Sequence, residues 1–168
     1  MAELTASERL QPCLLDRLTD EDPTHQVESR DRRVFSLRQI RESVLRDLSW
    51  LLNAPGRFSS EEFADAPEVR SSVIAYGVPD LCGVAASGLD VGSLERELTA
   101  AVRAFEPRLT SNSLRVEAVA RPDRFGGSAL VFEIAGDLWA QPVPEPLYVR
   151  TEVDLESGQH AVEEHTPA

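Results

Sequence analysis

The hydrophobic pattern of this chain changes its period once, near Arg108. Before that residue, apolar side chains recur every three or four positions, which is typical of amphipathic helices. After it, they alternate with polar neighbours, which is typical of strands with one buried face. A run of helices followed by a run of strands predicts an α+β fold, with helices packed on one face of a mostly antiparallel sheet.

The first long helix is predicted to begin at Ser36. Ser36 and Gln39 have the spacing of a capping box, in which each side chain bonds the backbone of the other residue. The turn sequence at 53–56, NAPG, predicts its end. One apolar stripe follows the spacing of this helix: Leu37, Ile40, Val44, Leu48 and Leu51.

Two further helices are predicted before the change of period. A short one is expected between Pro67 and Gly77, because proline favours a helix start and glycine a helix end. Its shared face would consist of Val69, Val73 and Tyr76. The third helix is expected to begin at Ser93 and to end just before Pro107. Its inner face would consist of Leu94, Leu98, Ala101, Val102 and Phe105.

The second part of the chain predicts four strands. Alternating apolar residues occur at 114–118, at 130–134 and at 147–155. The sequence RPDRFGGS at 121–128 predicts a glycine-rich turn between the first two of these strands. ESGQ at 156–159 predicts a hairpin turn into a last strand at 160–164.

The domain organisation follows from polarity. Residues 1–35 form a polar, acidic arm, which is interrupted by an apolar segment at 12–18. This segment predicts a short helix that docks on its own domain, with docking on a partner as the alternative. We expect a single folded domain at 36–164 and a short tail at 165–168.

The charge balance limits the function classes. With 17 basic and 29 acidic residues, the net charge is −12, which argues against a general nucleic-acid binder. No segment approaches the roughly 20 apolar residues of a membrane span. The first residues, MAELTASERLQ, lack the basic and apolar regions of a secretory signal. We therefore expect a cytoplasmic protein without direct membrane insertion.

Reactive side chains are few. Cys13 and Cys82 are far apart and are expected to be buried or half-buried thiols without a disulfide. His25, His160 and His165 lie in polar sequence and are expected at the surface. Because no cysteine or histidine has metal-ligand spacing, we expect neither a metal nor a cofactor.

The end of the third predicted helix, AFEPRL at 104–109, is unusual. Glu106 would lie at the negative end of the helix dipole, which costs about 0.3–1 kcal/mol. Either Arg108 pairs with Glu106 locally, or a partner molecule provides the compensating contact. In the second case an exposed glutamate and a forked arginine donor would form a charged corner for a neighbouring subunit.

A catalytic role for Glu106 is the alternative. Two carboxylates at glycosidase distance could hydrolyse peptidoglycan, with Glu106 as the general acid. Arg108 opposes this role, because a nearby cation favours the ionised carboxylate. The candidate second acids are common in so acidic a chain: Asp80, Glu117 and Glu133.

Four segments together, in their order and spacing, resemble the TssE family of bacterial type VI secretion baseplates. They are RDLSWLLNA, SSVIAYGVPDL, AFEPRL and LYVRTEVDLESGQ. The arm segment PCLLDRLTDEDP resembles the N-terminal arm of the same family. The resemblance extends from about residue 10 to residue 163. The wider family, which includes a phage baseplate wedge protein, has carried the description "lysozyme-like".

The resemblance implies a structural role without enzymatic activity. Members of the family occupy the baseplate wedge with TssF, TssG and TssK, and lie at the start of the sheath built from TssB and TssC. The family's Glu-Pro-Arg motif maps onto Glu106, Pro107 and Arg108, and the resemblance implies that these residues act in wedge assembly.

The last predicted strand is a second candidate contact. Residues His160, Ala161, Val162 and Glu163 are expected at a sheet edge, where a sheath subunit could add a strand. The alternative is an edge that charge protects from pairing. Two other functions stay open: a muramidase that uses Glu106, and the equivalent subunit of another contractile particle.

Overall fold

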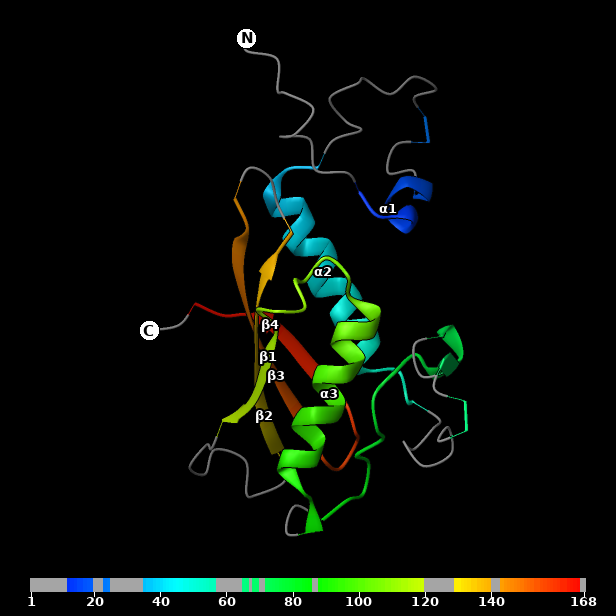
Figure 1. Cartoon of the computed structure of the whole chain (residues 1–168), viewed down its shortest axis with the longest axis vertical. Coiled ribbons are helices and arrows are strands. Elements are labelled where there is room, and N and C mark those ends of the chain that lie inside the picture. Colours follow the sequence, from blue (N-terminus) through cyan, green and yellow to red (C-terminus); the bar gives the residue numbers. More distant parts are fainter. Residues whose placement is uncertain are drawn as a thin grey trace.

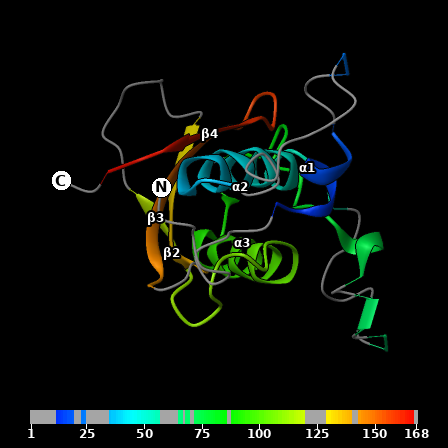
Figure 2. The same cartoon turned by 90° about the horizontal axis from the view of Figure 1, so that it is seen from above.

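The computed structural model confirms the α+β prediction. Two long helices lie against one face of an antiparallel sheet, and the other face carries no helix in the part of the chain that the structure describes (Figures 1 and 2). The described residues are 12–19, 23–24, 35–56, 65–66, 68–69, 72–85, 88–119, 129–139 and 143–166.

Helix α2, Leu37–Leu52, has the predicted start and end. The hydroxyl of Ser36 accepts the Gln39 N–H, and the Gln39 side chain accepts the Ser36 N–H. Because these bonds satisfy two of the otherwise unpaired N–H groups of the first turn, the helix begins at a defined residue. Asn53 is the C-cap.

Helix α3, Val91–Phe105, begins two residues earlier than the predicted Ser93. Asp90 is the N-cap, and its carboxylate accepts the Ser93 N–H at 3.1 Å. An aspartate is as good an N-cap as a serine, so the acid one turn upstream fixes the start. The helix ends at Phe105, as predicted, and Glu106 is its C-cap.

The described residues do not contain the α-helix predicted between Pro67 and Gly77: they show 3-10 geometry at 68–69 and in the turn η4, Val73–Ala75. Val73 is 87% exposed, so it does not belong to a buried helical face. The segment then reaches Gly77, whose φ is +129°. Its backbone approaches the end of α2, where Gly56 N–H donates to Val78 O and Val78 N–H to Ala54 O.

Within the described residues, four strands form a sheet in the order β1-β2-β3-β4, with every neighbouring pair antiparallel. Their bounds are Arg115–Val119, Ala129–Leu138, Glu145–Asp154 and His160–Glu164. The predicted hairpin turn before β4 is present, with Gly158 at φ +73°. The predicted turn at 121–128 lies outside the described residues.

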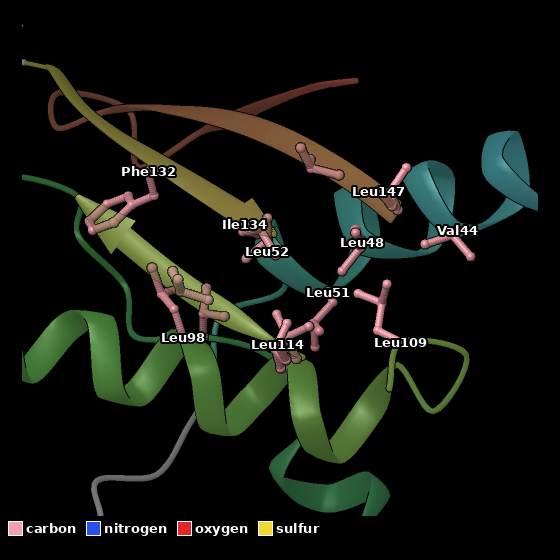
Figure 3. Packing of buried hydrophobic residues seen from close by; sticks show 14 of the residues in the cluster. Val44, Leu48, Leu51, Leu52, Leu98, Leu109, Leu114, Phe132, Ile134 and Leu147 are labelled. Atoms are coloured by element: carbon pink, nitrogen blue, oxygen red, sulfur yellow. The ribbon is translucent and has the colours of Figure 1, made fainter. Parts of the chain in front are cut away.

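The core lies between the sheet and the two long helices (Figure 3). Phe132 and Ile134 on β2 and Leu147 on β3 extend toward the apolar faces of α2 and α3, and each is at most 1% exposed. Burying a side chain of this size stabilises a fold by about 1.5–3 kcal/mol. The inward side chains of β3 and the apolar side chains of α2 therefore pack together in one layer.

The apolar segment of the arm forms helix α1, Leu14–Leu18, and it contacts its own domain, as predicted. None of its residues is buried, and Leu14 and Leu18 are 70% and 73% exposed. Its contact with α2 is polar, through Asp16 and Arg46. The proposed boundaries of the arm, the domain and the tail stay a prediction.

A charged cluster as the candidate functional site

Glu106 lies inside the molecule, between the end of α3 and the face of α2. It is 2% exposed, so the expectation of an exposed glutamate at this corner is wrong. The sequence left two possibilities for the compensating contact, and the structure contains the local one. Pro107 is exposed and Arg108 is partly exposed.

The Arg108 side chain points back toward Glu106 and forms hydrogen bonds with both oxygens of its carboxylate. The Arg108 Nε and backbone N–H donate to Oε1 at 2.6 and 3.2 Å, and Nη2 donates to Oε2 at 2.5 Å. This fork geometry is the strongest kind of ion pair between side chains. It offsets the unfavourable position of an acid at a helix C-terminus.

The fork continues into helix α2. Arg108 Nη1 donates to the Ser43 hydroxyl at 3.0 Å, and Nη2 donates to Asp47 Oδ2 at 2.5 Å. Ser43 and Asp47 are four residues apart, so they lie on one side of the helix. Because 61 residues separate Asp47 from Arg108, this contact joins two distant parts of the chain.

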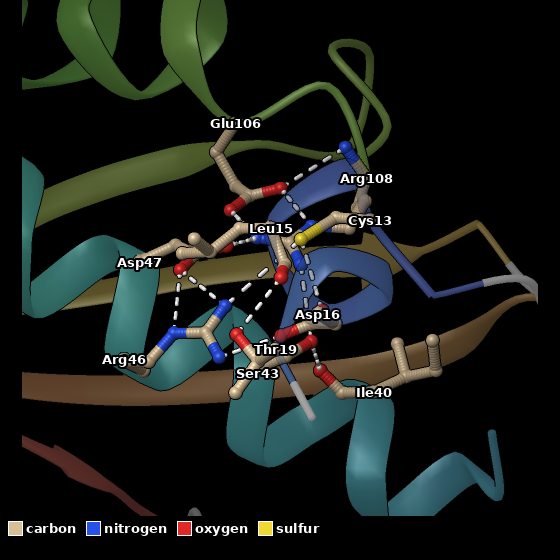
Figure 4. Close-up of polar contacts among 10 residues, drawn as sticks. All are labelled: Cys13, Leu15, Asp16, Thr19, Ile40, Ser43, Arg46, Asp47, Glu106 and Arg108. Carbon is tan, nitrogen blue, oxygen red and sulfur yellow. Dashed lines mark hydrogen bonds and ion pairs between the residues drawn. The ribbon is translucent and has the colours of Figure 1, made fainter. Parts of the chain in front are cut away.

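Arg46 extends the cluster to the arm (Figure 4). Its guanidinium contacts Asp47 at 2.7 Å and Asp16 of helix α1 at 2.6 Å. The Cys13 thiol donates to the other oxygen of Asp16 at 2.9 Å. A continuous chain of charges therefore runs from helix α1 through α2 to the Glu106–Arg108 corner. We call these residues the charged cluster: Cys13, Asp16, Ser43, Arg46, Asp47, Glu106 and Arg108.

The three acids and two arginines of the cluster are paired with one another. Burial alone would lower the pKa of Arg108, but its bonds to Glu106 and then Asp47 outweigh burial and raise that pKa. The pKa of Arg46 is raised in the same way against burial, by Asp16 and Asp47. The pKa of Asp16 is lowered, because the bonds from Cys13 and Arg46 outweigh the opposing effect of burial. Every charge here has an opposite partner within the chain.

Glu106 does not form a catalytic pair with any of the second acids that the sequence suggested. Glu117 and Glu133 are cross-strand partners on the face of the sheet away from the helices. Asp80 accepts the Cys82 N–H in a loop. The acid nearest to Glu106 through bonded contacts is Asp47, and Arg108 occupies the space between them.

The edge of β4 is only partly free. The Asn53 side chain donates to His160 O and accepts the His160 N–H, both at 3.0 Å. Ala161 and Glu163 direct their backbone groups toward β3, because the neighbouring Gln159 and His165 bond that strand and the pattern alternates. Of the four residues that we expected at an open edge, Val162 alone presents backbone groups that are unoccupied within the described part of the chain.

Two expectations about single side chains are wrong. His160 is 6% exposed, faces Thr151 and is not a surface histidine. Cys82 is exposed rather than buried, whereas Cys13 is half-buried, as expected. His165 is partly exposed, 4.0 Å from Glu133, and His25 lies outside the described residues.

Sequence reasoning missed Ser43, Asp47 and Asn53, the residues that tie α2 to the corner and to β4. A weak signal existed for Asp47: it follows Arg46 directly, and both charges lie next to the apolar stripe. The local sequence around Asn53 indicates only the end of a helix. Its pairing with His160, 107 residues later, has no local signature.

None of the described helices is long and apolar enough to cross a membrane. In the described ranges, no three side chains of histidine, cysteine, aspartate or glutamate gather in a geometry that could hold a metal ion.

Comparisons with known proteins give one match. Residues 38–143 match the family described as baseplate wedge protein gp25. No curated protein and no solved structure matches the chain. The matched range contains α2 except for Leu37, all of α3, β1 and β2, and most of the charged cluster. The chain therefore belongs to the gp25 family of baseplate wedge proteins, the structural family of phage-tail-like machines that also includes TssE.

Proposed function

We propose that this chain is the TssE-type wedge subunit of a type VI secretion baseplate, acting in the cytoplasm in a membrane-docked baseplate. In this role it binds TssF, TssG and TssK, and it helps to start the TssB/TssC sheath. The observation that carries the proposal is the family match, which includes Glu106, Pro107 and Arg108. The resemblance of four ordered segments to TssE supports the narrower assignment.

The charged cluster supports a role as a rigid contact surface. Glu106 has no free oxygen and almost no exposure, so it acts as an internal brace that fixes Arg108. Arg108 uses Nε, Nη1 and Nη2 within the chain, and its side chain stays 22% exposed. A partner subunit would contact the outer side of this preformed corner, with Pro107 and the rim of Arg108.

The test is co-purification with TssF–TssG. We expect Arg108→Lys to reduce the yield of the complex, because lysine keeps the charge and loses the fork. The matched control is Ile134→Val, a core change outside the charged cluster that costs about 0.5–1.5 kcal/mol. An equal yield for both variants would show that loss of stability, rather than the corner, explains the effect. Pro107→Ala tests the exposed surface separately.

The open part of β4 supports strand addition by a sheath subunit. The Asn53 side chain already bonds the outward backbone N–H and C=O of His160. The outward backbone groups of Val162 and Glu164 therefore stay available for hydrogen bonds to a new strand. We expect Val162→Pro to remove the required N–H donor and to reduce the number of sheaths per cell, while TssF–TssG binding is retained. Val162→Ala, which keeps the N–H, is the control. Normal sheath formation with Val162→Pro refutes this part of the proposal.

The family role is structural, and the proposed function is not enzymatic. A muramidase needs two carboxylates that open toward a sugar, and Glu106 is bonded on both oxygens to Arg108. Turbidity clearing of purified cell walls by the purified chain tests this alternative. Clearing that disappears in Glu106→Gln would overturn the structural assignment. Co-purification with the subunits of a different contractile particle, instead of TssF–TssG, would assign the chain to that particle.

A further inference from the structure

A groove of about 400 Å³ lies between the outer edge of β1 and the flank of helix α3. Figure 1 shows β1, in yellow-green, beside α3. The strand order β1-β2-β3-β4 places β1 and β4 at opposite edges of the sheet. The helix contributes residues at positions 95, 96, 99, 100 and 103, which is one side of an α-helix. Val116 of β1 forms the other wall.

The edge of β1 in this groove has one backbone group that is already bound by an acid. The Ala118 N–H donates to Glu95 Oε1 of helix α3 at 2.7 Å. Because backbone direction alternates along a strand, Val116 also directs its N–H and C=O away from β2 and into the groove. Glu95 therefore occupies the place that the carbonyl oxygen of an added strand would take.

The charge of the groove is unusual for this molecule. Arg96 and Arg103 line it, both are exposed, and neither pairs with another described residue. Glu95, the one acid in the lining, is engaged with Ala118. The groove thus presents two cations that no described residue pairs, in a chain whose net charge is −12. The small side chains of Thr99 and Ala100 line the groove between the two arginines.

We infer that the groove binds an extended acidic peptide segment of a partner protein, which adds to β1 as a fifth strand. The segment displaces Glu95, pairs its backbone with Val116 and Ala118, and places acidic side chains near Arg96 and Arg103. Backbone pairing provides affinity in this mode, and side-chain charge provides selectivity. This site lies at the other edge of the sheet from β4 and does not depend on the proposed role in a secretion machine.

The experiment uses the full chain and a fluorescent octapeptide of alternating glutamate and valine, followed by fluorescence anisotropy. The comparison peptides replace glutamate with lysine, or carry N-methyl groups on alternate amides. The protein variants are Arg96→Glu/Arg103→Glu and Glu95→Ala. The matched control is Arg17→Glu/Arg38→Glu, which makes the same charge change on exposed residues of α1 and α2.

We expect the glutamate peptide to bind the wild-type chain and Glu95→Ala, and to bind Glu95→Ala more tightly because the Ala118 N–H is free. The groove variant should weaken binding by about tenfold or more, since two charge contacts are reversed, and the control variant should not. One of the two N-methylation patterns should abolish binding. Three results would overturn the inference. The lysine peptide could bind as tightly as the glutamate peptide, or both double variants could lose the same affinity. The glutamate peptide could also fail to bind both the wild-type chain and Glu95→Ala. A concentration-dependent dimer that Arg96→Glu/Arg103→Glu dissociates would overturn it as well, because a second copy would then be the occupant.

Discussion

The role of Glu106 as an internal brace leads to a measurable loss of stability when it is removed. In Glu106→Ala, Arg108 loses three hydrogen bonds to this carboxylate, two from its guanidinium and one from its backbone N–H. Glu106 is 2% exposed, so its removal leaves part of the Arg108 guanidinium without a partner inside the fold. The perturbation therefore differs from the removal of an ordinary surface acid.

The magnitude follows from the partners that remain. Breaking a buried ion pair by removing one member costs about 3–5 kcal/mol, because the other charge is left unpaired. Arg108 keeps Asp47 and Ser43, and its side chain is 22% exposed, which reduces that cost. We expect Glu106→Ala to lower the free energy of unfolding by about 2–4 kcal/mol, and Glu106→Gln by about 1–2 kcal/mol.

The assay is urea unfolding of the purified chain at pH 7. With a slope of about 2 kcal/mol per molar urea, the Glu106→Ala midpoint should fall by roughly 1–2 M. Glu42→Gln is the control, because Glu42 makes an exposed i,i+4 pair with Arg38 that is worth about 0.3–0.5 kcal/mol. If Glu106→Ala shifts the midpoint no more than Glu42→Gln does, the carboxylate is not a brace and the account of the corner is wrong.

Three further predictions concern other parts of the fold. Burial lowers the pKa of His160 to about 4, below its ordinary 6.5, so protonation favours the unfolded chain. The contribution of neutral His160 to the free energy of unfolding should be fully present above pH 6.5. The free energy of unfolding should fall by about 1–2 kcal/mol between pH 6.5 and 5. Chemical unfolding at several pH values measures this slope, which His160→Gln should flatten. Gly77→Ala should cost about 2–4 kcal/mol in thermal or urea unfolding, because φ is +129° and a Cβ would lie 2.4 Å from Ala54 O; a loss below about 0.5 kcal/mol would contradict this geometry. Asp16→Asn should speed amide hydrogen exchange in residues 14–18 without changing the core, since Asp16 connects α1 to Arg46; unchanged exchange there would show that other contacts hold the helix.

The charged cluster illustrates why the site was only partly predictable. The sequence identified Glu106 and Arg108, and it named their local pairing as one of two possibilities. It did not identify Asp47 and Ser43, because these partners lie 61 and 65 residues away in sequence. It also placed Glu106 at the surface, since an acid at a helix end is usually solvated.

The edge of β4 was also only partly predictable from the sequence. Alternation predicted the strand and its place near the chain end, both of which are present. Alternation says nothing about the side chain that approaches a strand from another element. The two bonds from Asn53 to His160 therefore change which residues of β4 can accept a partner.

What the sequence determined by itself is the order and kind of the main elements. Helical spacing, a capping box and strand alternation act over a few residues, so they specify α2, the end of α3 and the strands without knowledge of the rest of the chain. The tertiary structure decided which distant side chains meet: Arg108 with Asp47, Asn53 with His160, and Glu95 with the edge of β1. The physical reason is that burial and hydrogen bonding depend on proximity in space. Packing of the sheet against the helices creates this proximity, and the local sequence pattern carries no information about it.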